Sequence, residues 1–153
     1  MSLRVHFYDN RPLDFRVRLI SLFIRDAAIN HCSLEYDGLL CTLADKRRGV
    51  VVVPASHYHH TVCSPTYTLE LGIVDSLTFL EPDDTYRVSG FKYLTWHLIG
   101  KHLGMPAPRS CAVHVSNILM KHNKLDRVIF YPDHLHKELT NADDNYSRSS
   151  GDR

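Results

Sequence analysis

A cysteine at the start of a late helix is the residue best placed for chemistry in this sequence. Pro106 and Pro108 end the preceding element, and Ser110 can cap the next helix because its hydroxyl accepts from a free first-turn N–H group. Cys111 then takes the first helical position, where the helix dipole and unpaired N–H groups lower a thiol's pKa and stabilise its thiolate. Because many buried thiols are only small core residues, this stretch alone leaves a nucleophilic and a structural role open.

An early hairpin carries the histidine that such a nucleophile needs. The dipeptide Asp37-Gly38 is a strong signal for a two-residue hairpin turn, with strands predicted over 30–36 and 39–44. The alternation of side chains along a strand then puts on one face His31, Ser33, Glu35, Leu40, Thr42 and Ala44. The opposite, more apolar face carries Cys32, Leu34, Tyr36, Leu39, Cys41 and Leu43.

Cys111 and His31 could form the thiol–imidazole pair of a cysteine hydrolase. Such an enzyme needs a thiolate, a histidine that removes and later returns a proton, and a third group that orients the histidine. His31 meets the second requirement if the polar face of the hairpin meets the helix start. Thr42 lies diagonal to His31 on that face and Ser33 is next along it, so either could orient the ring. Backbone N–H groups at the helix start could form an oxyanion hole.

The composition is that of an ordinary globular protein. Of 153 residues, 44% are hydrophobic and 23% charged, and a formal net charge of +1 gives no overall preference for nucleic acid or an acidic membrane. Residues 1–140 are predicted to form one domain, and the polar residues 141–153 a disordered tail. The chain shows neither a secretory signal pattern nor an apolar stretch that could span a membrane. Its four cysteines are therefore expected to be reduced, in the cytoplasm.

The predicted elements follow the order strand, helix, several antiparallel strands and then helices. This order is typical of an α+β fold in which a small antiparallel sheet packs against helices. Besides the hairpin, strands are predicted over 3–8, 50–53, 67–72 and 75–80. Helices are predicted around 15–25, over 85–103 with an apolar stripe of Phe91, Leu94 and Leu98, over 111–122 and over 134–139.

A histidine-rich segment between two strands suggests a different role. His57-Tyr58-His59-His60 and Cys63 carry ligand atoms that zinc accepts. No Cys-x-x-Cys accompanies them and their spacing fits no standard zinc finger, so a solvated loop is favoured and no metal or cofactor is expected. This loop could also border a hydrolase cleft and select substrate.

Another histidine, His114, lies off the apolar stripe of the helix predicted over 111–122 and is expected at the surface.

Five short motifs follow one another between about residues 27 and 139. They are the hairpin 30–38, Arg48-Gly49-Val50 with Pro54, the aromatic segment 91–96, Ser110-Cys111-Ala112 and the helix start 131–135. In this order they resemble the circularly permuted papain-like cysteine hydrolases, the YiiX/NlpC-type group. The departures are Val113, where the family often has an acidic residue, Thr95, in place of the aspartate of its aromatic motif, and the region of Cys41 and Thr42, where it often has Glu.

The resemblance implies a permuted papain-like topology and hydrolysis of an amide, ester or thioester through an acyl-enzyme on Cys111. Tyr93 and Trp96 of the aromatic motif, together with His57, are then expected to contact the substrate. Similar proteins act on peptides, peptidoglycan or lipid esters and occur in bacteria and phages, so a place in a virion, among virion proteins, is an alternative to the cytoplasm. A non-catalytic member of the same fold, acting as a binding or structural module, is the alternative function. A zinc-stabilised interaction protein is a third.

Overall fold

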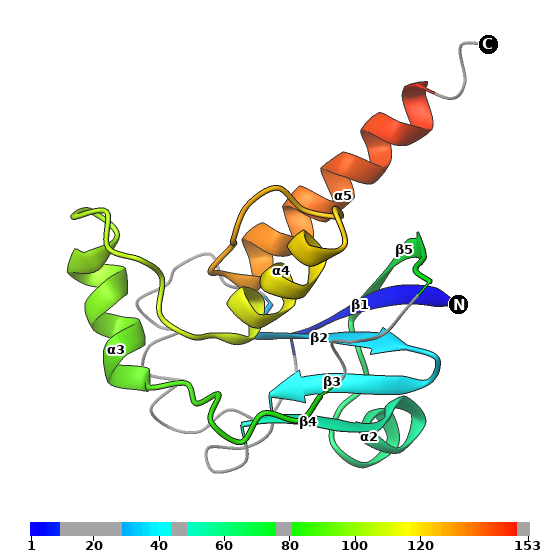
Figure 1. The fold of residues 1–153 in the computed structure, drawn as a ribbon, viewed down its shortest axis with the longest axis horizontal. Helices are drawn as coiled ribbons and strands as arrows, with labels where there is room; N and C mark the ends of the chain where they lie inside the picture. Colours follow the sequence, from blue (N-terminus) through cyan, green and yellow to red (C-terminus); the bar gives the residue numbers. More distant parts are fainter. Residues whose placement is uncertain (10–28, 44–48, 76–80, 150–153) are drawn as a thin grey trace.

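A five-stranded antiparallel sheet forms the centre of the computed structural model, which describes residues 1–9, 29–43, 49–75 and 81–149 (Figure 1). The strands lie in the order β4-β3-β2-β1-β5, with β2 in the middle. Every neighbouring pair is antiparallel, which together with the separate helices makes the fold α+β. The bounds of the strands are β1 (Ser2–Tyr8), β2 (His31–Tyr36), β3 (Leu39–Leu43), β4 (Val50–Pro54) and β5 (Tyr67–Ile73).

The tight turn between β2 and β3 has the predicted conformation. Asp37 and Gly38 both have positive φ, 51° and 74°, as a two-residue hairpin of type I′ requires. The pairs Tyr36 with Leu39 and Leu34 with Cys41 confirm the predicted register. The turn therefore fixes which side chains of the two strands face the same way.

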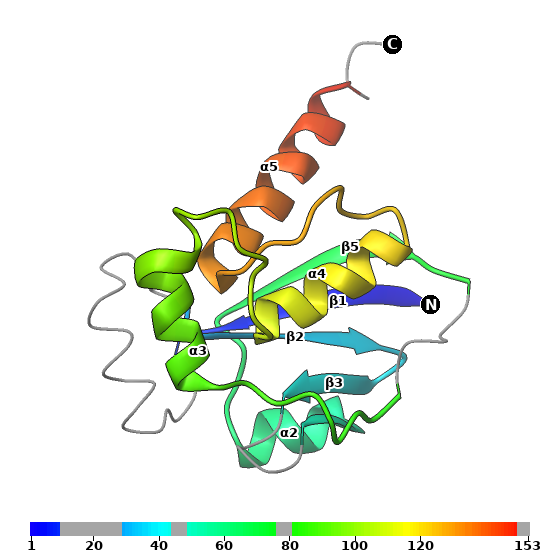
Figure 2. The same cartoon turned by 60° about the vertical axis from the view of Figure 1, so that its left-hand side comes forward.

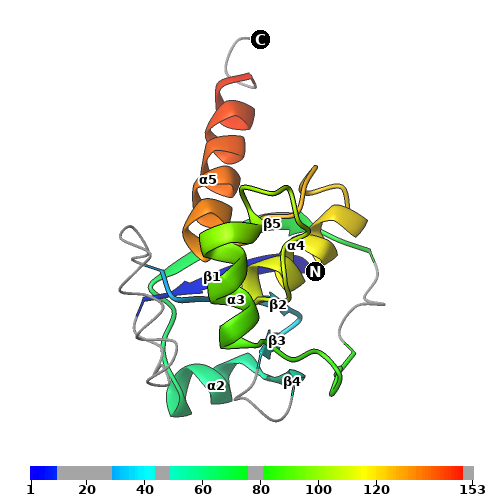
Figure 3. The ribbon, with the colours of Figure 1, turned by 90° about the vertical axis from the view of Figure 1, so that its left-hand side faces the viewer.

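Helices cover both faces of the sheet (Figures 2 and 3). The helices α4 and α5 lie over one face, and α2 lies over the other. A short α3 and the π-helical turn η1 that continues it lie to one side of the sheet. The bounds of these elements are α2 (Ala55–Thr61), α3 (Gly90–Thr95), η1 (Trp96–Gly100), α4 (Cys111–Lys121) and α5 (Pro132–Ser149). No helix in the described ranges is both long and apolar enough to cross a membrane.

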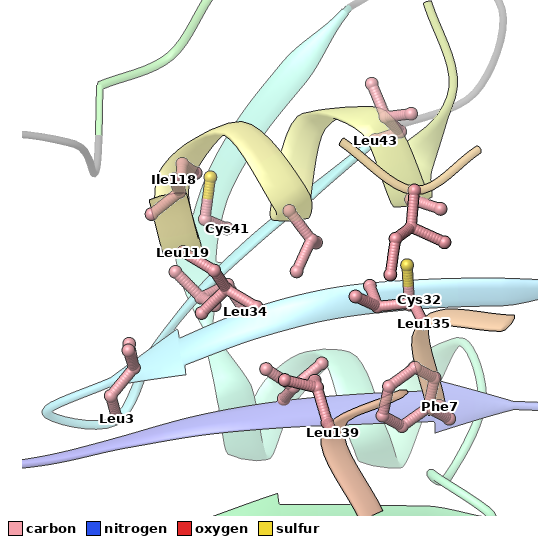
Figure 4. Close-up of a cluster of buried hydrophobic side chains, with 14 of the residues drawn as sticks. Leu3, Phe7, Cys32, Leu34, Cys41, Leu43, Ile118, Leu119, Leu135 and Leu139 are labelled. Atoms are coloured by element: carbon pink, nitrogen blue, oxygen red, sulfur yellow. The ribbon is translucent and has the colours of Figure 1, made fainter. Parts of the chain in front are cut away.

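The main core lies between the sheet and the helices α4 and α5 (Figure 4). The apolar face of the hairpin, with Cys32, Leu34 and Cys41, packs there as the alternation predicts. Leu119 from α4 and Leu135 from α5 are fully buried against it. A smaller cluster lies on the opposite face, beneath α2, and consists of Tyr8, Leu40, Ala55, Tyr58 and Cys63.

The prediction of one long helix over 85–103 is wrong about where the helix begins and about which side chains it buries. Asp83 accepts hydrogen bonds from the backbone and hydroxyl of Thr85, which holds this segment in a turn, and the helix begins only at Gly90. The next turn is π-helical, with Lys101 N donating to Trp96 O. As a result, Phe91 of the predicted apolar stripe is exposed rather than buried.

The predicted histidine-rich loop is also wrong, because residues 55–61 form α2. Ala55 and Tyr58, three residues apart, face the sheet and are buried. Packing of these two side chains on the sheet stabilises a helix that could not be predicted from the polar composition of the segment. His57 and His60 lie on the exposed side.

The last helix is longer than the sequence suggests. It continues from Pro132 through Ser149, whereas the composition predicts a disordered tail from 141, and its final turns extend beyond the rest of the structure (Figure 1). The helix predicted around 15–25 and most of the strand predicted over 75–80 fall outside the described residues.

Gly49→Ala is expected to destabilise the fold more than Gly38→Ala does. Both glycines have positive φ, 64° and 74°, which costs an alanine about 1–2 kcal/mol. At Gly49 an added Cβ would also lie 2.1 Å from Asp83 O, the carbonyl that accepts from Val50 N, whereas nothing lies within 4 Å of a Cβ at Gly38. We therefore expect a further loss of about 1–3 kcal/mol at Gly49, measured by urea unfolding. Equal losses in the two variants would contradict this.

Candidate active site

The start of α4 is held by a buried serine. Ser110 Oγ accepts from Val113 N at 3.1 Å and donates to Phe130 O at 3.1 Å, while Ser110 O accepts from the Tyr86 hydroxyl at 3.0 Å. This confirms Ser110 as the N-cap and Cys111 as the first residue of the helix. The thiol is thus attached to a helix start that is anchored on two sides.

His31 contacts a side chain of the neighbouring strand. It is the first residue of β2, and Thr42 lies in β3, beyond the pairs Leu34–Cys41, Glu35–Leu40 and Tyr36–Leu39 that the described residues form. There His31 Nε2 is hydrogen-bonded to Thr42 Oγ1 at 2.8 Å, and both side chains are buried. One nitrogen of the ring is therefore engaged by a hydroxyl, and the ring is held in a single orientation.

The thiol of Cys111 lies beside Cys32 and His31, which belong to the first two positions of β2. Hydrogen bonding to the Cys32 side chain, hydrogen bonding to His31 and its charge, and the Cys32 backbone N–H all lower the pKa of the Cys111 thiol well below its ordinary value. They outweigh burial, which acts in the opposite direction. The structure therefore brings Cys111 into contact with a histidine that is distant in the sequence, and it favours the thiolate there.

Two tyrosines border the thiol. Burial raises the pKa of Tyr86 to about 12 and also raises that of Tyr93, and the charge on Cys111 contributes to both shifts. The Tyr93 ring packs 4.6 Å from the Phe130 ring, between centroids. Tyr93, which the resemblance assigned to substrate binding, therefore lies within range of the charge on Cys111, although no described contact joins the two side chains.

Trp96 packs on the same aromatic ring as Tyr93 and has a further partner of its own. Its ring packs 4.2 Å from that of Phe130, between centroids, and its indole N–H donates to Met105 O at 2.9 Å. Trp96 thus supports the aromatic cluster that carries Tyr93, and no described contact joins it to Cys111.

The other two sequence-predicted residues lie away from the thiol. Ser33 Oγ is hydrogen-bonded at 2.9 Å to the hydroxyl of Tyr8 and not to His31, so Thr42 is the one of the two candidates that contacts the imidazole. His57 is exposed on α2, which covers the opposite face of the sheet from α4 (Figures 1 and 3).

His114, which its position off the apolar stripe places at the surface, is partly buried in the structure. It lies between α4 and β3, with its Nε2 3.5 Å from Cys41 Sγ and its ring 5.0 Å from that of Tyr86. Burial lowers the pKa of His114 and raises that of Cys41 to about 11. This second thiol–imidazole contact therefore favours the neutral form of both groups, in contrast to the pair formed by Cys111 and His31.

Sequence reasoning missed the roles of Cys32 and Tyr86. The thiol of Cys32 and its backbone N–H both stabilise the Cys111 thiolate, and Tyr86 anchors the helix start. The position of Cys32 beside His31 was visible in the sequence, but it reads as a core position because it faces the apolar side of the hairpin. For Tyr86 the sequence held no signal, since its partner follows 24 residues later.

A polar cluster on the opposite face of the sheet was also missed. His6 lies between Thr68 Oγ1, 2.8 Å from its Nδ1, and Glu35 Oε2, 2.6 Å from its Nε2. The ring of His59 from α2 stands edge-on to His6 with 4.8 Å between centroids, so three strands and one helix meet there. The alternation predicted the face of Glu35, but its neighbours depend on strand order, which the sequence does not reveal.

The zinc-ligand types in and after α2 do not converge. Cys63 is buried against Tyr8 and Leu40, His59 Nε2 is hydrogen-bonded to the Tyr8 hydroxyl at 3.1 Å, and His57 is exposed. Throughout the described part of the chain, no three His, Cys, Asp or Glu side chains are grouped to hold a metal ion.

Comparison with known proteins does not assign this site. No family model matches the chain, and neither a curated protein nor a solved structure matches it significantly. Its function must therefore be argued from the geometry of the site.

The protein is expected to lose stability as the pH falls below about 6.5. Burial lowers the pKa of five histidines in the folded state, so just below pH 6.5 these side chains bind protons in the unfolded chain but not in the native one. Their contribution to the free energy of unfolding is therefore fully present above 6.5, the pKa in the unfolded chain, and is lost as the pH falls from there through the lower pKa values of the folded state. Urea unfolding at pH 7.5, 6.5 and 5.5 measures this; a constant or rising free energy of unfolding would contradict it. The residues are His6, His59, His97, His114 and His136.

Proposed function

We propose that this protein is a cysteine hydrolase that cleaves an amide, ester or thioester bond through an acyl-enzyme on Cys111. The observation that carries the proposal is the contact of Cys111 with His31, whose other side is held by Thr42 Oγ1 at 2.8 Å. A nucleophile, a base and an orienting group in this order are the parts that nucleophilic acyl transfer requires.

The orientation of His31 suits proton transfer to and from the thiol. His31 is hydrogen-bonded to Thr42 through Nε2 and also to Cys111, and we assign the contact with the sulfur to the other ring nitrogen, Nδ1. A proton that moves from the Cys111 thiol to this nitrogen leaves a thiolate beside an imidazolium, and each ion stabilises the other. The Thr42 hydroxyl accepts from the Nε2–H of that imidazolium, but it adds no negative charge.

In the first half of the reaction, the Cys111 thiolate attacks the carbonyl carbon of the substrate. The carbonyl π electrons move to oxygen, and when the tetrahedral intermediate collapses, the bond to the leaving group breaks. His31 gives its proton to the departing amine, alcohol or thiol. In the second half, His31 removes a proton from water, the resulting hydroxide attacks the thioester, and the acid is released as the proton returns to the sulfur.

The helix start offers donors for the oxyanion. First-turn N–H groups of a helix lack intrahelical partners, and in α4 the amide of Val113 is already occupied by Ser110 Oγ. The amides of Cys111 and Ala112 therefore remain as candidates to donate to the negative oxygen, where the helix dipole adds to their effect.

The order of the elements supports a permuted papain-like topology for this hydrolase. The histidine lies on the second strand, the orienting threonine on the third, and the cysteine at the start of a helix that follows the sheet and packs on it. This agrees with the resemblance seen in the sequence motifs. On this proposal the substrates are peptides, peptidoglycan or lipid esters, and the cytoplasm or a phage particle is the place of action.

Acetylation by p-nitrophenyl acetate tests the proposal without knowledge of the natural substrate. At pH 6, where an unperturbed thiol with a pKa of about 8.5 is less than about 1% ionised, Cys111 is expected to become acetylated and then to release acetate. His31→Gln is expected to slow acetylation about a hundred-fold or more, because the general base is lost. Stopped-flow release of nitrophenolate and mass mapping of the acetyl group measure the two steps.

Cys41 is the matched control for this experiment. Burial raises the pKa of its thiol to about 11, so it should resist acetylation at the same pH, and Cys111→Ser should abolish the fast phase while leaving the fold intact by circular dichroism. If Cys111 reacts no faster than Cys41 in the folded protein, the hydrolase proposal fails. A non-catalytic binding or structural module then becomes the better account.

Thr42→Val tests the orienting group. Loss of the hydroxyl removes the hydrogen bond to His31 Nε2, and we expect acetylation of Cys111 to slow about ten-fold, the equivalent of one ordinary hydrogen bond. Thr42→Ser keeps the hydroxyl and should retain most of the rate. Ser33→Ala should leave the rate nearly unchanged, since Ser33 contacts Tyr8. Equal rates for Thr42→Val and Thr42→Ser would remove Thr42 from the mechanism.

A further inference from the structure

The segment formed by α3, η1 and the turn that follows has an aromatic side that packs on the body of the protein and a second set of apolar residues that no described element covers. The inner side consists of aromatic residues. Tyr93 and Trp96 pack on Phe130, and His97 Nδ1 is hydrogen-bonded to the Tyr131 hydroxyl. These contacts attach the segment to the body of the protein and determine which side faces outward.

The outer side exposes large apolar residues to solvent. Phe91 is 79% exposed and Leu103 is 70% exposed, and the segment lies at the edge of the structure, beside the sheet rather than over it (Figures 1 and 2). Exposed apolar residues that cluster on a surface and are bordered by polar residues often mark a site of interaction. We call this outer side the α3 patch; it consists of Val88, Phe91, Leu98, Ile99, Leu103 and Met105.

The α3 patch belongs to a stretch of the chain whose own charged side chains are all positive, although Asp83, just before this stretch, lies close enough to Arg109 for the two charges to interact. No Asp or Glu occurs between residues 85 and 109, whereas this stretch contains the four exposed cations Arg87, Lys92, Lys101 and Arg109. The chain as a whole has a formal charge of only +1, so the positive charge of this stretch is balanced elsewhere. A partner of the patch must therefore accept both apolar side chains and positive charge.

We propose that the α3 patch docks the protein on an anionic lipid surface. Side chains such as Phe91 and Leu103 would enter the boundary between headgroups and acyl chains, and Lys92 and Lys101 would lie among the headgroup phosphates. Apolar residues on one side of a helical segment with Lys and Arg at its flanks are the pattern of interfacial segments. Electrostatic attraction to acidic lipids adds to the apolar burial. This proposal does not depend on the reaction at Cys111.

Two other occupants agree less well with the charges. A second copy that docked through the same patch would bring two sets of four cations together, which disfavours a two-fold dimer there. Protein–protein interfaces are depleted in lysine, whereas two of the four cations here are Lys92 and Lys101. An anionic lipid surface is compatible with both observations.

Vesicle flotation with the full chain tests the proposal. We expect the protein to float with vesicles of phosphatidylcholine containing about one third phosphatidylglycerol, a content that gives a strongly anionic surface. It should bind vesicles of phosphatidylcholine alone at least ten-fold more weakly, and raised salt should weaken binding to the anionic vesicles. Phe91→Ser with Leu103→Ser, and separately Lys92→Glu with Lys101→Glu, should each reduce binding at least ten-fold.

Matched substitutions elsewhere on the surface separate a specific patch from general properties. Ile73→Ser removes an apolar residue that is 74% exposed at the end of β5, and Lys124→Glu reverses an exposed charge after α4; neither should change binding. Acetylation of Cys111 should be unchanged in all these variants, so failure of this proposal and failure of the hydrolase proposal are distinguishable.

Three results would overturn the proposal. The first is no flotation with anionic vesicles, or flotation that the patch variants do not reduce. The second is a dimer in light scattering that Phe91→Ser with Leu103→Ser converts to a monomer, which would assign the patch to a second copy. The third is a much larger loss of thermal stability in that double variant than in Ile73→Ser, which would mean that another part of this chain covers the patch.

Discussion

The register of the β2–β3 hairpin is the constraint on which the rest of the candidate site depends. The positive φ values of Asp37 and Gly38 make a two-residue turn possible, and this turn pairs Leu34 with Cys41. A slip of one residue would exchange the two faces of the strands. His31 would then lose the Thr42 hydroxyl, and Cys32 would turn away from the core and from Cys111.

Burial and hydrogen bonding have opposite effects on the pKa values of the cysteines near this hairpin. Removing water from a thiolate raises its pKa, as at Cys41. At Cys111 the same burial is outweighed by the donors of Cys32 and His31. Since His114 next to Cys41 does not produce this effect, proximity of a histidine alone does not lower the pKa of a thiol. The hydrogen bonds that Cys32 and His31 provide from β2 account for the difference.

The sheet separates two kinds of environment. The face under α4 and α5 is a continuous apolar core (Figure 4), while the face under α2 carries the hydrogen-bonded network of His6, Glu35 and Thr68. On the same face, the hydroxyl of Tyr8 is hydrogen-bonded to Ser33 and His59, and its ring packs 5.5 Å from that of His31, between centroids. The buried side chains of His6 and Glu35 are hydrogen-bonded to each other, as buried polar groups must be.

The sequence by itself determined the features that depend on near neighbours in the chain. These are the Ser110 cap, the position of Cys111 at the helix start, and the turn that puts His31 and Thr42 on one face, because capping and turn conformation are local interactions. Only the tertiary structure decided that Thr42 rather than Ser33 contacts His31, that Cys32 lies against Cys111, and that Phe91 is exposed rather than packed against another described element. Those outcomes depend on the order of the strands and on how Phe130 and α4 pack, which are contacts between residues far apart in the chain.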